Sequence, residues 1–137
     1  MFYLFTYGTL MKGFRNHAFL SSQKFIKQFK LDGVYLKRAT NEVTGGYEYP
    51  VMFIGDNKNG VLGEIYECED YLLSFLDALE GEGYLYYRVK FKAKIKNVTE
   101  DIFVYIGNPD VWGDVDMPLI ESGKWEDFDE KDEVIEK

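Results

Sequence analysis

The chain has 137 residues, 46% of them hydrophobic and 18% aromatic, which is enough to form one domain around a single core. Its formal net charge is −8, and the acidic excess lies after residue 109, since residues 1–109 have 13 acidic and 13 basic side chains. Without a basic excess we expect no nucleic-acid partner, and no apolar run approaches the ~20 residues that a membrane span requires.

Strand patterns dominate the first hundred residues. Residues 2–7 form an apolar and aromatic run that ends at Gly8, which is typical of a buried strand. Asn16 then precedes residues 17–26, and its side-chain oxygen could accept from free backbone N–H groups, which predicts a short helix there. Further strand patterns cover residues 29–36, 49–55 and 60–68.

A turn and a helix are predicted next. The turn-rich sequence "GDNKNG" joins the strands at 49–55 and 60–68, which predicts a hairpin between them. Residues 69–80 have leucine and phenylalanine at helical spacing, with acidic residues at the start and Gly81 just past the end. The helix is therefore expected to end near Glu80.

The last predicted elements are two paired strands. Residues 84–95 alternate apolar and basic side chains, as a half-exposed strand does, and residues 101–107 can pair with them. Many short strands with one central helix indicate a mixed α+β domain, plausibly a small sheet closed into a barrel. We assign this single domain to residues 1–126.

The C-terminal end differs in charge from the rest of the chain. Residues 110–137 have 11 acidic and 3 basic side chains, and residues 127–137 are interpreted as a solvated acidic tail. Trp112 and Trp125 are expected to pack the segment before it onto the domain, because tryptophans commonly bury much of their surface.

Cysteine use and the N-terminus bear on the compartment. Cys68 is the single cysteine, so no intrachain disulfide can form and nothing indicates an oxidising compartment. The first residues show neither a basic leader nor a small-residue cleavage site. We therefore expect a soluble protein of the cytoplasm.

Several kinds of chemistry find little support. His17 is the single histidine, and the sequence has no G-x-S-x-G motif or reactive-cysteine context, which argues against nucleophilic catalysis. His17 also lacks a nearby His or Cys companion for a metal. The glycines fit neither a phosphate loop nor a dinucleotide fingerprint. We expect no metal and no organic cofactor.

A loop and an acid remain as candidates. Gly8 allows close approach and positive φ, so the turn after the first strand could point several N–H groups at an oxygen or a carboxylate. A carboxyl at the end of an apolar helix, such as Glu80, is often partly buried, which would raise its pKa toward neutrality and suit proton transfer. The alternative is that Glu80 is an exposed residue at the helix end.

Five segments of the chain carry a resemblance to a known family. They cover roughly residues 2 to 109 and read "FTYGTLMKGFRNHAFL", "YPVMFIG", "GEIYEC", "FLDALEGEGYLYYRVKFKA" and "FVYIGNP". On these segments the chain resembles the gamma-glutamylcyclotransferase-like family, most closely its gamma-glutamylamine cyclotransferase branch, which includes many AIG2-like proteins. Asn16 and His17 match the Asn-His pair of the family, although the predicted cap already accounts for Asn16.

The resemblance implies a fold and an activity. The family has a small closed mixed β-barrel with flanking short helices, and it cyclises a gamma-glutamyl group: the α-amine attacks the γ-carbonyl, which releases 5-oxoproline and a free amine. Carried over by position, Tyr7, Gly8, Thr9 and Leu10 match the substrate-binding loop and Glu80 matches the acid/base glutamate. The partner would be a small gamma-glutamyl compound.

Other residues are weaker candidates. Glu82 ranks second as the acid but lies in a predicted exposed turn, and Glu64 lies on a strand where a structural hydrogen bond is the simpler interpretation. Tyr105 is expected to contact substrate, and Arg88 and Tyr87 are further candidates to line the cavity.

Two questions stay open at this point. A binding module that keeps the pocket without turnover is the competing hypothesis. The leaving group could be a lysine ε-amine, an amino acid, a cysteinyl peptide or an acyl carrier.

Overall fold

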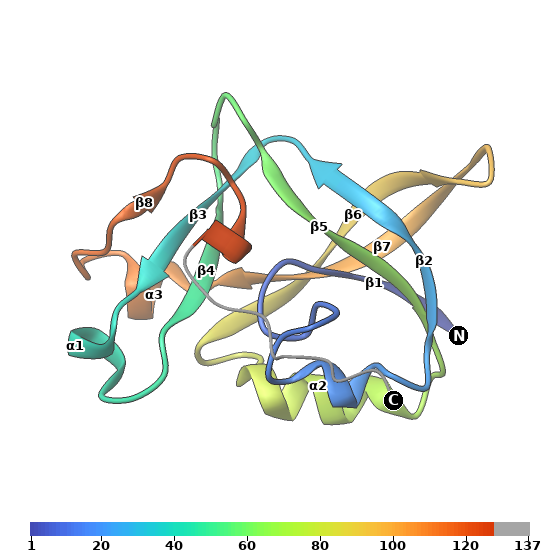
Figure 1. Ribbon diagram of the computed structural model, residues 1–137, viewed down its shortest axis with the longest axis horizontal. Helices are drawn as coiled ribbons and strands as arrows, with labels where there is room; N and C mark the ends of the chain where they lie inside the picture. The colour runs from blue at the N-terminus through green and yellow to red at the C-terminus, as the bar shows by residue number, and fades with distance from the viewer. Residues whose placement is uncertain (128–137) are drawn as a thin grey trace, which may run out of the picture.

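The computed structural model describes residues 1–127, whose strands form two sheets (Figure 1). The five-stranded sheet has the order β2-β5-β1-β7-β6, with β1 Phe2–Thr6, β2 Lys24–Leu31, β5 Val61–Cys68, β6 Tyr86–Ile95 and β7 Val98–Gly107. The three-stranded sheet has the order β4-β3-β8, with β3 Val34–Ala39, β4 Tyr49–Ile54 and β8 Leu119–Ile120.

Helices are few and short, as a mixed α+β fold dominated by strands requires, so the predicted fold class is confirmed at that level. The longest is α2, and the others span a turn or so: α1 Asn41–Thr44, α2 Leu72–Glu80, α3 Pro109–Trp112, and the 3-10 turns η1 His17–Phe19 and η2 Trp125–Asp127. Within residues 1–127 no helix is long and apolar enough to cross a membrane.

The prediction of a closed barrel is wrong, because neither sheet closes. The edge strands β2 and β6 of the larger sheet do not pair with each other. Immediately after β2 the chain turns at Gly33, whose φ of 76° suits glycine, and β3 joins the other sheet. The single strand predicted over residues 29–36 is therefore the end of β2 and the start of β3, and this split divides the strands between two sheets.

The predicted hairpin of residues 49–55 with 60–68 is also wrong. β4 pairs antiparallel with β3, whereas β5 pairs antiparallel with β1 on one side and with β2 on the other. Since both edges of β5 are occupied, β4 has no free edge to pair with. The turn-rich segment between them connects two sheets instead of two neighbouring strands.

The helix predicted after Asn16 is reduced to the three residues of η1, and residues 24–26 already belong to β2. The side chain of Asn16 makes no capping hydrogen bond to η1. It donates instead to Thr9, so the residue has a tertiary role that a local capping rule does not include.

The helix and strand pair of the second half are confirmed. α2 ends at Glu80, and Gly81 caps it in the left-handed conformation with φ 63° while Leu72 and Leu76 face the core. β6 pairs with β7 along its whole length, and the turn between them is short, formed by Lys96 and Asn97 with positive φ.

The core lies on both faces of the central strand β1. Phe5 packs in one cluster with the fully buried Trp125, and Leu4 packs in the other with Leu76 and Trp112. Both tryptophans are thus buried, as the sequence predicted. The proposed acidic tail lies outside the described residues, except for Asp127, whose carboxylate accepts from Ser122.

Candidate active site

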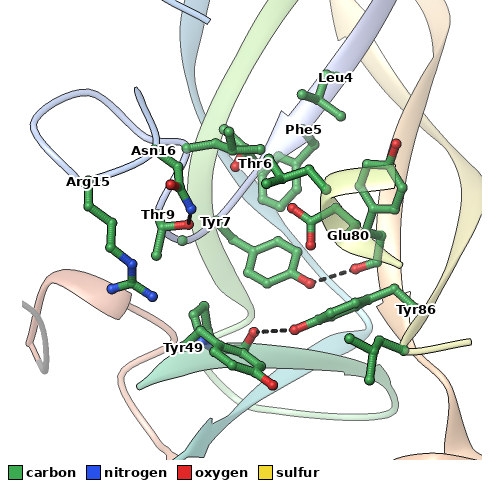
Figure 2. Close-up of a pocket in the computed structure, with 16 residues that line it drawn as sticks. Leu4, Phe5, Thr6, Tyr7, Thr9, Arg15, Asn16, Tyr49, Glu80 and Tyr86 are labelled. Carbon is green, nitrogen blue, oxygen red and sulfur yellow. Dashed lines mark hydrogen bonds between the residues drawn. The ribbon is translucent and has the colours of Figure 1, made fainter. Parts of the chain in front are cut away.

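A cavity of about 190 Å³ opens where the end of β1, the end of α2 and the start of β4 meet (Figure 2). Figure 1 shows the loop after β1 next to α2 at the same end of the large sheet. Every residue predicted for the site lines this cavity: Tyr7, Gly8, Thr9, Leu10, Glu80 and Tyr105. The weaker candidates Glu82, Glu64, Arg88 and Tyr87 are not among the described lining residues.

Gly8 lets the loop pass close to β4. A Cβ at this position would lie 2.6 Å from Cγ of Pro50, a distance that real side chains do not tolerate. The expected positive φ is absent, because Gly8 is not among the glycines with left-handed backbone in residues 1–127. The glycine is therefore needed for space rather than for an unusual conformation.

The loop of residues 7–16, called here the 7–16 loop, is tied together by the Asn-His pair. Asn16 Nδ2 donates to Thr9 Oγ1 at 2.8 Å, and the Asn16 N–H donates to the Thr9 carbonyl at 2.9 Å. The Nδ1–H of His17 donates to the Leu10 carbonyl at 2.9 Å. Both residues thus hold the backbone of the predicted substrate loop, which the sequence analysis did not foresee.

Glu64, which lies in β5, holds the same loop from another side. Its buried carboxylate accepts from the Lys12 N–H at 2.8 Å and from the Tyr66 hydroxyl at 3.0 Å. The structural hydrogen bond predicted for Glu64 is therefore present, and its partner is the backbone of the 7–16 loop.

Some backbone donors of this loop belong to residues that line the cavity. Within residues 1–127 the backbone N–H groups of Thr9 and Leu10 donate no hydrogen bond, although Leu10 is buried. A buried N–H without a partner is costly and rare in proteins. These two groups are suited to an oxygen atom of a ligand.

On the opposite side of the cavity, Glu80 extends from the last turn of α2, and Figure 2 shows its carboxyl beside the ring of Tyr7. The residue is partly buried rather than exposed. Burial raises the pKa of the Glu80 carboxyl from 4.5 to about 7. No hydrogen bond or ion pair reaches this carboxyl from residues 1–127, so nothing lowers the pKa again.

Tyrosine rings enclose the carboxyl. The Tyr7 hydroxyl donates to the Tyr105 carbonyl at 2.6 Å, and the Tyr86 hydroxyl donates to the Pro50 carbonyl at 3.0 Å. Burial, and then the nearby Glu80, raise the pKa of Tyr7 well above its usual value. These phenols stay neutral, and together with the rest of the lining they leave Glu80 only partly exposed to water.

The hydroxyl of Tyr105 is not part of this group of tyrosines around Glu80. Its hydroxyl donates to Asp77 Oδ1 at 2.7 Å, and Asp77 also pairs with Arg88. Tyr105 therefore lines the cavity with its ring while its hydroxyl belongs to a neighbouring polar cluster. Arg88, a candidate for the cavity, belongs to that cluster as well.

Ten of the described lining residues were not predicted for the site, among them Arg15, Asn16, Tyr49 and Tyr86. Tyr86 has the same parity as the exposed lysines of β6, so strand alternation places it on the wrong face. Arg15 and Tyr49 lie in or beside loops, where periodicity gives no signal. For Asn16 the sequence did offer a signal, its match to the Asn-His pair of the family. The residue was not assigned to the site because it was interpreted as a helix cap.

Metal ligation finds no support in this cavity. Across the part of the chain that the structure describes, no three His, Cys, Asp or Glu side chains gather as ligands. Among the described lining residues, Glu80 has the one carboxyl, and the other side-chain oxygens belong to threonine and tyrosine hydroxyls and to the amide of Asn16.

The fold and the cavity together define a small α+β protein in which a carboxyl of near-neutral pKa and residues with unpaired backbone N–H groups line one cavity, an arrangement suited to acid–base chemistry on a small molecule. The family model "Gamma-glutamyl cyclotransferase, AIG2-like" matches residues 4–127. The chain belongs to this family.

Individual relatives agree with the family. The chain is 31% identical over 134 residues to the "Putative gamma-glutamylcyclotransferase" of Methanocaldococcus jannaschii, covering 93% of this chain and 98% of that protein. It is 29% identical over 97 residues to the gamma-glutamylaminecyclotransferase of Rattus norvegicus, covering 69% and 65%. Both relatives are named as cyclotransferases, which places this chain among enzymes.

The fold is shared with solved structures. The crystal structure of an AIG2-like protein from Mus musculus superposes with a TM-score of 0.71 at 25% identity, covering 89% of this chain and 87% of that one.

Proposed function

We propose that this protein is a gamma-glutamyl(amine) cyclotransferase that uses Glu80 as its acid/base. The α-nitrogen of a gamma-glutamyl group attacks its own γ-carbonyl carbon, the bond from that carbon to the leaving nitrogen breaks, and 5-oxoproline and a free amine are released. The α-ammonium loses two protons in all, and the leaving amine gains two. One carboxyl that passes these protons singly therefore balances the reaction.

The observation that carries this proposal is the position of Glu80. Its pKa of about 7 leaves the carboxyl ready both to accept and to return a proton near neutral pH. General acid–base catalysis of this kind is typically worth ~10²–10⁴ in rate. The tyrosine side chains in the lining limit the exposure of Glu80 to water, which favours direct proton transfer between substrate and carboxyl.

The 7–16 loop supports the proposal from the other side of the cavity. The N–H groups of Thr9 and Leu10 can hold an oxygen of the glutamyl head, either its α-carboxylate or the oxyanion that develops on the γ-carbonyl. Tyr7 and Gly8 shape the wall next to them, and Tyr105 closes it.

The reaction asks little more of the protein. Nucleophile and electrophile lie in one molecule and close a five-membered ring, so positioning alone can supply up to ~7–11 kcal/mol through effective molarity. No covalent intermediate with the enzyme is needed. We place the whole reaction within residues 1–126, with residues 127–137 as an acidic tail.

The competing proposal is a small-molecule binding module on the same fold. The experiment is a panel of gamma-glutamyl compounds assayed for release of 5-oxoproline: gamma-glutamyl-ε-lysine, gamma-glutamyl amino acids and glutathione. Turnover of at least one compound is expected. Binding of panel members without release of 5-oxoproline from any of them would favour the binding module.

A further inference from the structure

A carboxylate outside the cavity attaches the last turn of α2 to the large sheet. The buried residues of this helix, Leu72 and Leu76, lie in its earlier turns. In the last turn Asp77 and Glu80 are partly buried, and the two residues between them are exposed. The carboxyl of Glu80 receives no hydrogen bond from residues 1–127, so its place depends on how the backbone of this turn is held.

The carboxylate of Asp77 binds two neighbouring strands at once. Its Oδ1 accepts from the Tyr105 hydroxyl of β7 at 2.7 Å, and its Oδ2 accepts from the guanidinium of Arg88 in β6. Arg88 and Tyr105 lie directly opposite each other in the two strands, so their side chains leave the same face of the sheet. Hydrogen bonds to an ionised group are stronger than neutral ones, which makes this a firm attachment for the helix end.

Tyr105 connects this carboxylate with the opposite wall of the cavity. Its hydroxyl donates to Asp77, whereas its backbone carbonyl accepts from the Tyr7 hydroxyl at 2.6 Å. Figure 2 shows the Glu80 carboxyl beside the ring of Tyr7. Asp77 and Glu80 are three residues apart and therefore neighbours on one side of the helix. The hydrogen bonds of Tyr105 thus set where the helix end lies relative to the start of the 7–16 loop.

We infer that Asp77 is a positioning residue, which holds the last turn of α2 against Tyr105 so that the carboxyl of Glu80 stays enclosed and in reach of the substrate. This inference rests on the proposed function. The side chain of Asp77 is not among those described as lining the cavity, so it acts through Tyr105 and the helix. Loss of the link should therefore lower turnover and leave the binding by the loop unchanged.

The test removes the link and leaves every charge in place. Tyr105→Phe keeps the ring that lines the cavity and loses the hydroxyl that donates to Asp77. We expect kcat for 5-oxoproline release to fall ~10-fold, because a displacement of about 1 Å caused by a distant substitution can cost ~10²-fold in rate. KM should stay within about twofold of the wild type, since the interactions of the loop are kept.

Variants of Asp77 test whether it acts through this hydroxyl. Asp77→Ala should lower kcat at least as much as Tyr105→Phe, and the double variant should be no slower than Asp77→Ala alone. Asp77→Asn keeps an oxygen that can accept from Tyr105, so it should recover part of the lost turnover.

An NMR titration of the Glu80 carboxyl carbon separates positioning from a general loss of stability. In the folded wild type the pKa should be about 7. When the last turn is loosened, the carboxyl meets more water, and its pKa should fall toward 4.5 in both Tyr105→Phe and Asp77→Ala. Burial and the bond to Asp77 raise the pKa of Tyr105, so this phenol is neutral and its replacement removes no charge.

Tyr66→Phe is the matched control. Tyr66 is buried, donates to the carboxylate of Glu64 at 3.0 Å and is not among the described lining residues. Its variant loses the same kind of hydrogen bond, between a tyrosine and a carboxylate, on the loop side of the cavity. A similar loss of thermal stability is expected, with the pKa of Glu80 still near 7.

The remaining outcomes are also decisive. A Glu80 pKa that stays near 7 in Tyr105→Phe or in Asp77→Ala would overturn the inference, and so would an equal fall in Tyr66→Phe. An unchanged kcat, or additive losses of kcat in the double variant, would overturn it as well. If the wild type releases no 5-oxoproline from any panel compound while the pKa falls only in the Tyr105 and Asp77 variants, the proposed function fails and the positioning of the carboxyl stands.

Discussion

The 7–16 loop is held by hydrogen bonds from Asn16 to Thr9 and from His17 and Glu64 to its backbone, whereas across the cavity the carboxyl of Glu80 receives no hydrogen bond from residues 1–127. The loop is thus fixed by hydrogen bonds at several points along its length. The helix end has an acid surrounded by rings, and its pKa is raised for that reason.

This difference separates positioning from chemistry. A loop fixed by several hydrogen bonds presents the N–H groups of Thr9 and Leu10 at a constant place, which suits binding. A carboxyl with no hydrogen-bond partner can gain or lose a proton without disrupting a hydrogen bond to the protein, which suits proton transfer. Substitutions on the two sides should therefore change different kinetic constants.

The largest effect is expected from Glu80→Gln. The amide is nearly isosteric, but it cannot accept the proton of the α-ammonium and return it to the leaving amine. We expect kcat to fall by ~10²-fold or more, with a folded protein and preserved substrate binding. Initial rates of 5-oxoproline release and calorimetry measure the two effects separately.

Glu82→Gln is the matched control for this substitution. Glu82 lies two residues further on in an exposed turn, and its side chain is not among those described as lining the cavity. Its variant should keep kcat within about twofold of the wild type, as surface substitutions usually do. A wild-type rate in Glu80→Gln, or a large loss in Glu82→Gln, would move the acid/base role away from Glu80.

The second effect is a pH dependence that only the Glu80 side of the cavity should cause. The carboxyl must be ionised to take a proton, so kcat/KM should rise about tenfold per pH unit up to a break near pH 7. A break near 4.5, the ordinary value, would show that the carboxyl is solvated in the working enzyme.

The same raised pKa has a consequence for stability. Between pH 4.5 and about 7 the folded state keeps the Glu80 proton that the unfolded state has lost, so stability decreases as pH rises through this window. Above it, Glu80→Gln should be more stable than the wild type by up to about 3 kcal/mol, the energy of a shift from 4.5 to about 7. Denaturant unfolding of both proteins at pH 4.5 and 8 provides this measurement.

The sequence predicted the end of α2 and the residues that line the cavity beside it better than it predicted the sheets. Glu80 follows a strong helical pattern and precedes Gly81, so local rules were sufficient to place the helix end, and the resemblance supplied the rest. The contact of Glu64 with Lys12 joins segments 52 residues apart, and that of Asn16 with Thr9 spans seven residues of an irregular loop, so no helix or strand period predicts either of them.

The errors in the fold have the same origin. The pattern of residues 60–68 identifies a strand but does not say which strands pair with it. In the structure β1 and β2 occupy both of its edges. Whether β2 and β6 meet to close a barrel depends likewise on the path of the chain at Gly33. Hydrophobic alternation specifies a buried face and leaves the partner strand open.

The smallest effect is expected on the loop side, from Asn16→Ala. Removing the amide loses the hydrogen bond to Thr9 Oγ1, which should destabilise the ordered loop by about 1 kcal/mol and raise KM about fivefold, with kcat little changed.

Because Asn16 also lines the cavity, a direct contact with substrate must be separated from this indirect role. Thr9→Val removes the acceptor hydroxyl, whereas Thr9→Ser keeps it. If Asn16 acts through Thr9, the double variant Asn16→Ala/Thr9→Val should raise KM no more than either single variant, and Thr9→Ser should behave as the wild type. Additive increases in KM would instead show that Asn16 touches the substrate itself. A fall in kcat would show that the loop also contributes to the chemical step and would contradict the separation of binding from proton transfer.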